Sequence, residues 1–209
     1  MKQNQQVVII DYGMGNIGSI INMLKFLGYK SVVSNDETII KNADKIILPG
    51  VGHFDHAIEN IQKLHLLEVI NETAIIKKKP FLGICLGMQI MCQSSEEGEL
   101  SGLSLIDAHV KKFSFNLQSN LKVPHMGWNL ISISKDSNLL DSLDNNSRFY
   151  FVHSYYVQCK NEGDILTKTN FGLDYVSSFE KDNLIGVQFH PEKSHRFGIT
   201  LFKNFLEKY

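Results

Sequence analysis

The chain has 209 residues, of which 43% are hydrophobic, and this size and composition are typical of one globular domain covering residues 1–209. Its 21 lysine and arginine residues nearly balance 22 aspartate and glutamate residues, so the formal net charge is -1 and no overall basic field favours nucleic acid or an anionic membrane. The apolar run near the start is too short for a signal peptide or a membrane-spanning helix, so we expect no membrane association and a cytoplasmic location.

The first half of the chain alternates predicted strands with predicted helices. The apolar run at 7–10 is typical of a strand, and apolar residues then recur at helical spacing from Ile17 until Gly28 ends the helix. The same criteria predict strands at 30–34, 45–49 and 80–84, and helical structure from about 56 to 76. Alternation of this kind is typical of a parallel sheet.

From Glu97 onward, short β-rich runs separated by polar or glycine-bearing turns replace this alternation. Strands are predicted at 103–106, 109–115, 129–134, 149–157, 174–180 and 184–189. The stretch 199–209 is amphipathic and predicts a last helix that packs its apolar face on the sheet.

The stretch DYGMGNIG at 11–18, directly after the first strand, has the G-x-G-x-x-G spacing of a turn that binds a dinucleotide pyrophosphate. Asp36 and Glu37 lie near the distance at which an acidic residue would meet the ribose. A dehydrogenase is therefore one interpretation of this stretch. The glycine pattern has a high false-positive rate outside its full structural context, so the interpretation stays an alternative.

The most informative stretch, PFLGICLGMQIM at 80–91, places Cys85 between Gly83 and Gly87 at the end of a predicted strand. This is the spacing of the G-x-S-x-G nucleophile elbow, with cysteine in place of serine. A thiol at a strand-to-helix turn gains thiolate character, and the thiolate is the nucleophile. The free N–H of Leu86 is a candidate donor to an oxyanion. A buried structural cysteine is the alternative, which the two flanking glycines disfavour.

A candidate base lies near the other end of the chain, where His190 and Glu192 follow an apolar strand in GVQFHPEKS. Residues two apart in an extended segment share a face, so the carboxylate is expected to orient the imidazole. Histidine can exchange a proton with the thiol and with a leaving amine. Together with Cys85, these residues form a Cys-His-Glu set suited to acyl transfer.

A second oxyanion donor is suggested by LPGVGHF at 48–54. Proline and glycine bring this strand end into a tight loop that exposes the amide of Val51. A plain turn explains the same residues without any catalytic role, and the spacing alone does not separate the two interpretations.

Six motifs stand in the order found in class I glutamine amidotransferases, which this sequence resembles over nearly its whole length. They are LPGVGHF (48–54), GICLGMQ (83–89), SEEG (95–98), PHMGWN (124–129), FVHSYY (151–156) and QFHPEKS (188–194). Of these, PHMGWN and HPEKS are similar to the glutaminase subunits of imidazole glycerol phosphate synthases in histidine biosynthesis. The resemblance implies an α/β fold, a three-layer α/β/α sandwich around a mixed, largely parallel sheet.

The resemblance also implies roles for individual residues. It makes Cys85 the nucleophile, His190 the general acid and base, Glu192 the residue that orients it, and Val51 and Leu86 the oxyanion-hole donors. The residues that it assigns to the glutamine pocket are Gly52, Gln89, Glu97 and the backbone of His153, Ser154 and Tyr155. Without the resemblance, Gln89 and Glu97 would be interpreted as an ordinary polar helix face and a solvated acidic run.

The implied reaction hydrolyses L-glutamine through a glutamyl thioester and needs no metal and no organic cofactor. Free ammonia is mostly protonated in neutral water, so we expect a shielded path into a partner. The resemblance implies a heterodimer with a (βα)8 cyclase, with Asn16 and Lys193 as interface candidates. Gly18 and EKSHRFG at 192–198 are more similar to paralogues that supply amidotransferases of surface-glycan sugars, so the acceptor stays open.

A cysteine peptidase or small-molecule hydrolase of related fold is a further alternative, since it would share the elbow but not the glutamine pocket. Cys92 is expected to pack in the core and Cys159 to follow a strand. The spacing of the three cysteines indicates neither a disulfide framework nor a zinc site. His125 and Trp128 are core or interface residues, which the sequence does not separate.

Overall fold

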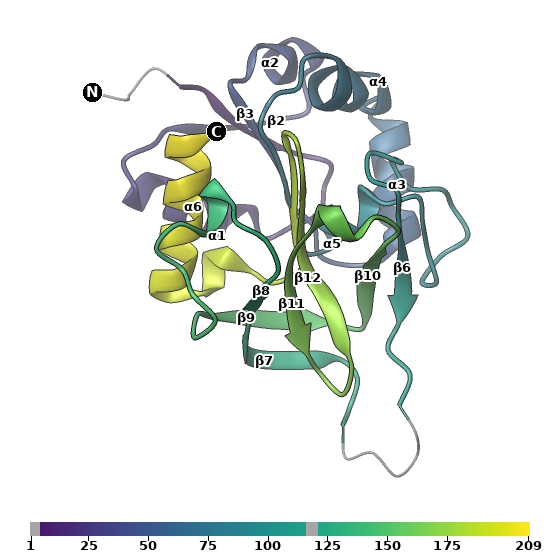
Figure 1. Ribbon diagram of the computed structural model, residues 1–209. Coiled ribbons are helices and arrows are strands. Elements are labelled where there is room, and N and C mark those ends of the chain that lie inside the picture. The colour runs from purple at the N-terminus through teal and green to yellow at the C-terminus, as the bar shows by residue number, and fades with distance from the viewer. Residues whose placement is uncertain (1–4, 116–120) are drawn as a thin grey trace.

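The computed structural model describes residues 5–115 and 121–209 and is built around one large sheet (Figure 1). The strand order along the sheet is β2-β1-β3-β4-β13-β12-β10-β6-β5. Its first five members run parallel to one another. They are β1 (Val7–Ile10), β2 (Ser31–Ser34), β3 (Lys45–Leu48), β4 (Phe81–Ile84) and β13 (Leu184–Val187). Parallel strands end at the same edge, so β4 and β13 deliver the residues that follow them to one place.

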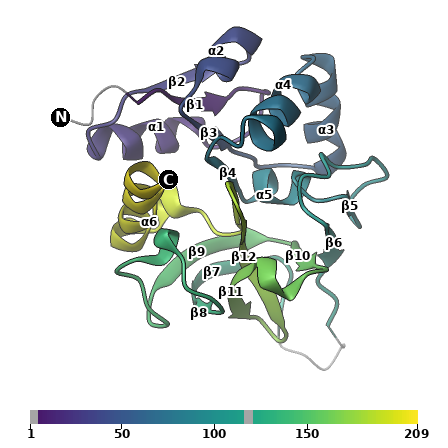
Figure 2. The ribbon, with the colours of Figure 1, turned by 45° about the horizontal axis from the view of Figure 1, so that its top comes forward.

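The remaining strands make the sheet mixed, because β12, β10 and β6 continue it with antiparallel pairings. The strands of this part are β12 (Asp174–Lys181), β10 (Tyr155–Cys159), β6 (Ala108–Lys112), β5 (Ser94–Ser95), β11 (Ile165–Asn170) and β8 (Ser132–Ile133). A separate antiparallel ribbon is formed by β7 (His125–Leu130) and β9 (Arg148–His153). This ribbon lies beside the antiparallel half in both views (Figures 1 and 2).

Helices cover both faces of the parallel half (Figure 2). One face carries α1 (Ile17–Phe26) and α6 (His195–Lys208). The other face carries α2 (Glu37–Asn42), α3 (Phe54–Lys63), α4 (Leu67–Asn71), the π-helical turn η1 (Glu72–Ile76) and α5 (Leu86–Ile90). Short 3-10 turns lie at η2 (Asn138–Leu140), η3 (Glu162–Asp164) and η4 (Pro191–Lys193). The predicted three-layer α/β/α sandwich around a mixed, largely parallel sheet is confirmed.

Strand β1 shows why the layers form. Val7 and Ile9 point into the core beneath α1 and α6, whereas Val8 and Ile10 point into the core beneath α3 to α5. All four side chains are fully buried. Successive side chains of a strand face opposite sides, so a strand buried on both faces is apolar throughout.

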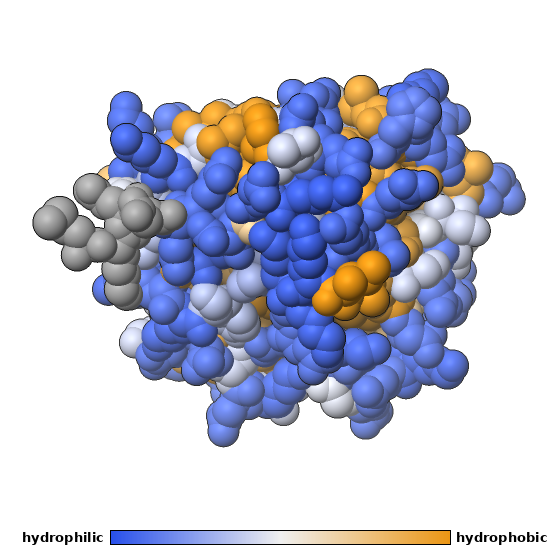
Figure 3. Space-filling model, turned by 90° about the horizontal axis from the view of Figure 1, so that it is seen from above, coloured by the Kyte–Doolittle hydropathy of each residue, from blue (hydrophilic) through white to orange (hydrophobic). Residues whose placement is uncertain are grey.

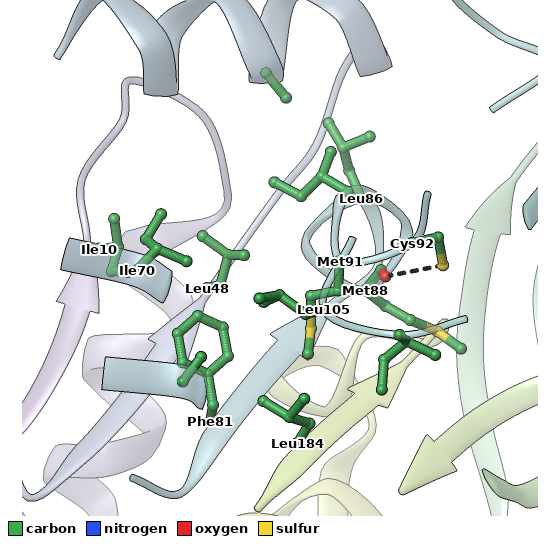
Figure 4. Close-up of a cluster of buried hydrophobic side chains, with 14 of the residues drawn as sticks. Ile10, Leu48, Ile70, Phe81, Leu86, Met88, Met91, Cys92, Leu105 and Leu184 are labelled. Atoms are coloured by element: carbon green, nitrogen blue, oxygen red, sulfur yellow. Dashed lines mark hydrogen bonds between the residues drawn. The ribbon is translucent and has the colours of Figure 1, made fainter. Parts of the chain in front are cut away.

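The second of these cores packs around α5, whose Leu86 and Met88 point into it (Figure 4). Met88 of α5 and Cys92 beyond it are fully buried there, together with Leu48 and Phe81 from the sheet. The Cys92 thiol donates to the carbonyl of Met88 at 3.7 Å. Cys92 is therefore a core residue, as the sequence indicates.

Several element predictions differ from the structure, and the predicted strand at 149–157 is divided into β9 and β10. The helical stretch predicted at 56–76 is divided, because His65 adopts a left-handed φ of 55° between α3 and α4. Residues 103–106 form no strand, and Ser104 there has a φ of 53°. Strand β11 escaped prediction because its buried Thr167 is polar. The Thr167 hydroxyl instead bonds to the hydroxyls of Ser177 and Ser178, at 2.8 and 2.6 Å.

The outer surface over α2 and α4 is mostly hydrophilic, with separate hydrophobic patches (Figure 3). Among the described residues, no helix is long and apolar enough to cross a membrane.

Candidate active site

Cys85 occupies a strained turn between β4 and α5. Its backbone has φ 55° and ψ -110°, a conformation that residues with a Cβ rarely adopt. The flanking glycines permit this turn, because a Cβ on Gly83 would lie 2.5 Å from the Met91 sulfur and one on Gly87 would lie 1.9 Å from the Leu48 carbonyl oxygen. The predicted elbow is therefore present, although α5 is only five residues long. Cys85 as a whole residue is 6% exposed.

His190 reaches Cys85 because β13 and β4 are parallel neighbours in the sheet, with Val187 opposite Ile84. The amide of Cys85 donates to the Val187 carbonyl at 2.8 Å. Both strands end at the same edge, so residues that are about a hundred positions apart in the sequence come together. This explains how the chain assembles the pair that the two motifs predict.

Glu192 stands behind His190, and His190 Nδ1 lies 2.8 Å from Glu192 Oε1. The sequence argument places the two residues in extended structure, but Glu192 lies in the 3-10 turn η4. The turn nevertheless brings the Glu192 carboxylate within hydrogen-bonding distance of the His190 imidazole. Asn16 at the start of α1 donates its amide to the same carboxylate oxygen at 3.3 Å. The imidazole and the carboxylate are each only 1% exposed.

The charge state of His190 follows from these contacts. Burial acts to lower the pKa of His190, but its interactions with the neighbouring Cys85 and Glu192 outweigh burial and raise the pKa to about 10. The protonated imidazole is thus favoured beside the Cys85 sulfur. Such a pair is suited to nucleophilic attack followed by protonation of a leaving amine.

The predicted residues converge on one cavity of about 330 Å³. Its lining includes Val51, Gly52, Cys85, Leu86, Gln89, Glu97, His153, Ser154, Tyr155 and His190. Sequence reasoning missed two further lining residues, Pro124 and Val152, although both lie inside the quoted motifs PHMGWN and FVHSYY. Glu192 lies behind the cavity, and Asn16 and Lys193 lie outside its lining.

The two candidate oxyanion donors do not face a common point. The N–H of Leu86 donates to the Gly50 carbonyl at 3.3 Å. The carbonyl of Gly50 and the N–H of Val51 belong to one peptide plane and point in opposite directions across it. Because the carbonyl is turned toward Leu86, the Val51 N–H is turned away from it.

Two polar side chains of the cavity are held by hydrogen bonds. Gln89 Nε2 donates to the Tyr155 carbonyl at 3.0 Å and to Gln188 Oε1 at 2.9 Å. Glu97 Oε2 accepts from the N–H of Phe54 at 3.0 Å. Sequence reasoning assigns no role to Gln188, although it is the first residue of the quoted motif QFHPEKS.

The family model described as "Glutamine amidotransferase class-I" matches residues 8–209. The chain belongs to the class I glutamine amidotransferases. The family predicted from the six motifs is thereby confirmed.

Several curated relatives of this amidotransferase are named as subunits of imidazole glycerol phosphate synthase. The chain is 49% identical over 202 residues to "Imidazole glycerol phosphate synthase subunit HisH 2" of Methanococcus maripaludis, covering 97% of this chain and 99% of the relative. It is 47% identical to the protein of the same name from Pseudomonas aeruginosa, covering 96% and 98%. It is 43% identical to "Imidazole glycerol phosphate synthase subunit HisH" of Leptospira interrogans, covering 94% and 97%.

Solved structures share the amidotransferase fold at lower identity. A structure described as a glutamine amidotransferase superposes with a TM-score of 0.75 at 16% identity, covering 96% of this chain and 97% of that one. A glutamine amidotransferase from Thermotoga maritima gives a TM-score of 0.65 at 17% identity, covering 99% and 85%.

Outside the cavity, the structure of this amidotransferase shows whether His125 and Trp128, which the sequence left as core or interface residues, are buried or exposed. His125 is 4% exposed and bonds through Nδ1 to the Tyr175 hydroxyl at 3.0 Å, so it is a core residue. Trp128 is 46% exposed and stacks on His195 with ring centroids 5.3 Å apart. Within residues 5–115 and 121–209, no group of three or more histidine, cysteine, aspartate or glutamate residues is placed to hold a metal ion.

Proposed function

We propose that the chain hydrolyses L-glutamine to glutamate and ammonia and serves as the glutaminase subunit of an imidazole glycerol phosphate synthase. One observation carries this proposal. Cys85 is held on a strained elbow beside His190, whose Nδ1 lies 2.8 Å from Glu192 Oε1. The names of the curated relatives support the particular synthase.

The reaction begins when the Cys85 thiolate attacks the carboxamide carbon of glutamine and forms a tetrahedral oxyanion. His190 then donates its proton to the departing nitrogen, the carbon–nitrogen bond breaks, and ammonia leaves a glutamyl thioester on Cys85. A water molecule loses a proton to His190 and attacks the thioester, which releases glutamate and restores the thiol. Glu192 fixes the orientation of His190 and stabilises the imidazolium.

The substrate's polar ends match the remaining cavity residues. Glu97 supplies a carboxylate for the α-ammonium group of glutamine. Both Nε2 contacts of Gln89 are made within the protein, so its Oε1 is left to accept from the substrate. Gly52 and the backbone of His153, Ser154 and Tyr155 complete the pocket. This arrangement favours an amidotransferase over a peptidase, which would need neither Gln89 nor Glu97.

Ammonia must reach its acceptor without entering water, and we propose that a (βα)8 cyclase docks to receive it. The proposed docking face consists of Asn16, Met126, Trp128 and Lys193. Met126 and Trp128 are two residues apart on β7, so both lie on its outward face, where they are 64% and 46% exposed. Lys193 lies over the Tyr150 ring at 5.9 Å, and Tyr150 in turn contacts Trp128. Asn16 joins this face to Glu192.

The test uses glutamine labelled with heavy nitrogen in its carboxamide, the purified chain, and the cyclase from the same source with its phosphorylated ribulosyl substrate. We expect labelled imidazole glycerol phosphate, and none with Cys85→Ala. Cys92→Ala is the control that keeps the label transfer, because Cys92 packs in the core away from the cavity. If glutamate forms but the cyclase neither binds nor receives label, the acceptor is a sugar, as Gly18 and residues 192–198 would then indicate.

A further inference from the structure

Gln188 is a fully buried amide directly after the apolar strand β13. A buried amide is costly unless its polar atoms are hydrogen-bonded. Its Oε1 lies 2.9 Å from Gln89 Nε2, and its Nε2 lies 3.7 Å from the Cys85 sulfur. Gln188 is thus placed between a side chain of the cavity and the nucleophile.

The direction of these hydrogen bonds is fixed by a backbone carbonyl. The Tyr155 carbonyl can only accept, so the amide group of Gln89 that faces it at 3.0 Å must be the NH2 group. The same nitrogen faces Gln188, so Gln188 must present its oxygen to Gln89. The NH2 group of Gln188 is then left facing the sulfur of Cys85. A flipped Gln188 would set two NH2 groups against each other.

A second contact holds the carbonyl itself in place. His153 Nδ1 lies 2.7 Å from the same Tyr155 oxygen, and burial lowers the pKa of His153 to about 3, so the ring is neutral. A neutral ring that donates through Nδ1 leaves Nε2 to accept from the Tyr175 hydroxyl, 3.2 Å away. The Tyr155 carbonyl oxygen therefore accepts from both His153 and Gln89, and this fixes the start of the chain of hydrogen bonds that ends at Cys85.

We propose that Gln188 stabilises the thiolate of Cys85 by donating an N–H to its sulfur, and that it positions Gln89 so that Gln89 offers only an oxygen to the substrate. This inference rests on the proposed function, because it takes Cys85 as the nucleophile. A donor aimed at the sulfur favours the charged form and supports the sulfur again as the leaving group when the thioester is hydrolysed.

The expected signature lies in the pH dependence of thiol reactivity. Without the donor, the thiolate forms only at higher pH, but a thiolate without a hydrogen bond is intrinsically at least as nucleophilic. Removal of the donor should therefore move the midpoint of the pH–rate profile upward and leave the plateau rate nearly unchanged. Mere damage to the fold would instead lower the plateau.

The experiment measures alkylation of Cys85 by iodoacetamide between pH 5 and 10, with the label located on the Cys85 peptide by mass spectrometry. Gln188→Met is compared with wild type, with Gln62→Met as a matched control on the exposed side of α3. We expect Gln188→Met to shift the midpoint upward by about one pH unit, which is about tenfold slower alkylation near neutral pH. Gln62→Met should follow wild type.

A second variant covers the case in which Gln188→Met does not fold. Gln188→Glu keeps the side-chain shape and the acceptor for Gln89 but places a carboxylate beside the sulfur, so its midpoint should also move upward. An unmoved midpoint in a folded Gln188 variant overturns the inference while the proposed function stands. A wild-type Cys85 that reacts no faster than Cys92 and Cys159, in a chain that releases no glutamate, overturns both.

Discussion

The N–H of Leu86 is engaged by the carbonyl of Gly50, 3.3 Å away. In the proposed reaction this N–H must instead donate to the oxyanion of the tetrahedral intermediate. The Gly50–Val51 peptide must rotate by about half a turn before both amides face that oxyanion. Under the proposed function, the oxyanion hole of the isolated chain is therefore unassembled.

From this we predict that the isolated chain hydrolyses glutamine slowly and that the cyclase with its nucleotide ligand accelerates it. The gain should lie in kcat, by about 100- to 1000-fold per recovered donor, with a smaller change in KM, because an oxyanion exists only near the transition state. Steady-state glutamate production with and without the liganded cyclase measures both constants. Equal kcat values under the two conditions would contradict the prediction, and Cys85→Ala supplies the background rate.

The sequence predicts those parts of the site in which residue type and spacing determine geometry. Gly83 and Gly87 indicate the elbow because no side chain fits there, and the parallel strands before Cys85 and His190 end at the same edge. The orientation of the Gly50 carbonyl could not be predicted, since a peptide plane can rotate without any change of residue.

The burial of hydrogen-bonded polar residues could not be predicted from the sequence either. Gln188 and Thr167 are buried because neighbours satisfy their polar atoms, and those neighbours lie far away in the sequence. Hydrophobic periodicity therefore located the apolar strands and missed β11.

The opening glycine motif allows a matched pair of substitutions. Gly15 has a φ of 120°, and a Cβ there would lie 2.8 Å from Pro49, whereas a Cβ on Gly18 would meet nothing within 4 Å. We expect Gly15→Ala to lower the free energy of unfolding by more than about 1 kcal/mol and Gly18→Ala to raise it by about 0.5 to 1 kcal/mol, as a helical glycine replaced by alanine does. Urea unfolding of both variants measures these changes.

The same pair bears on the dinucleotide interpretation. In that motif the third glycine permits close helix–strand packing, so little room for a side chain would be expected at Gly18. Destabilisation by Gly18→Ala, or binding of NADH by the wild-type chain at micromolar concentrations, would count in favour of a nucleotide site.

Acid should destabilise the chain through His125. Burial lowers the pKa of His125 from 6.5 to about 4, so the folded chain holds it neutral while the unfolded chain protonates it. Neutral His125 contributes fully to the free energy of unfolding above about pH 6.5, and this contribution is lost as the pH falls toward 4. At pH 5 the loss amounts to about 2 kcal/mol. We expect His125→Gln to lose less stability than wild type between pH 7 and pH 5 in urea unfolding. Identical losses in the two chains would exclude this role for His125.

The backbone strain at Cys85 predicts that glycine there gives a more stable protein than alanine, the opposite of the order expected at an unstrained position. Cys85→Ala and Cys85→Gly both remove the thiol and should both release no ammonia, but only alanine keeps a Cβ in the backbone conformation of φ 55° and ψ -110°. Such strain costs about 1 to 3 kcal/mol and exceeds the entropic cost of glycine, so Cys85→Gly should be more stable than Cys85→Ala by about 1 kcal/mol.

Cys92 provides the control for this prediction. It is not among the residues with positive φ, so Cys92→Ala should be more stable than Cys92→Gly. Thermal unfolding of the four variants measures both differences. If Cys85→Ala is at least as stable as Cys85→Gly, the elbow stores no strain at Cys85.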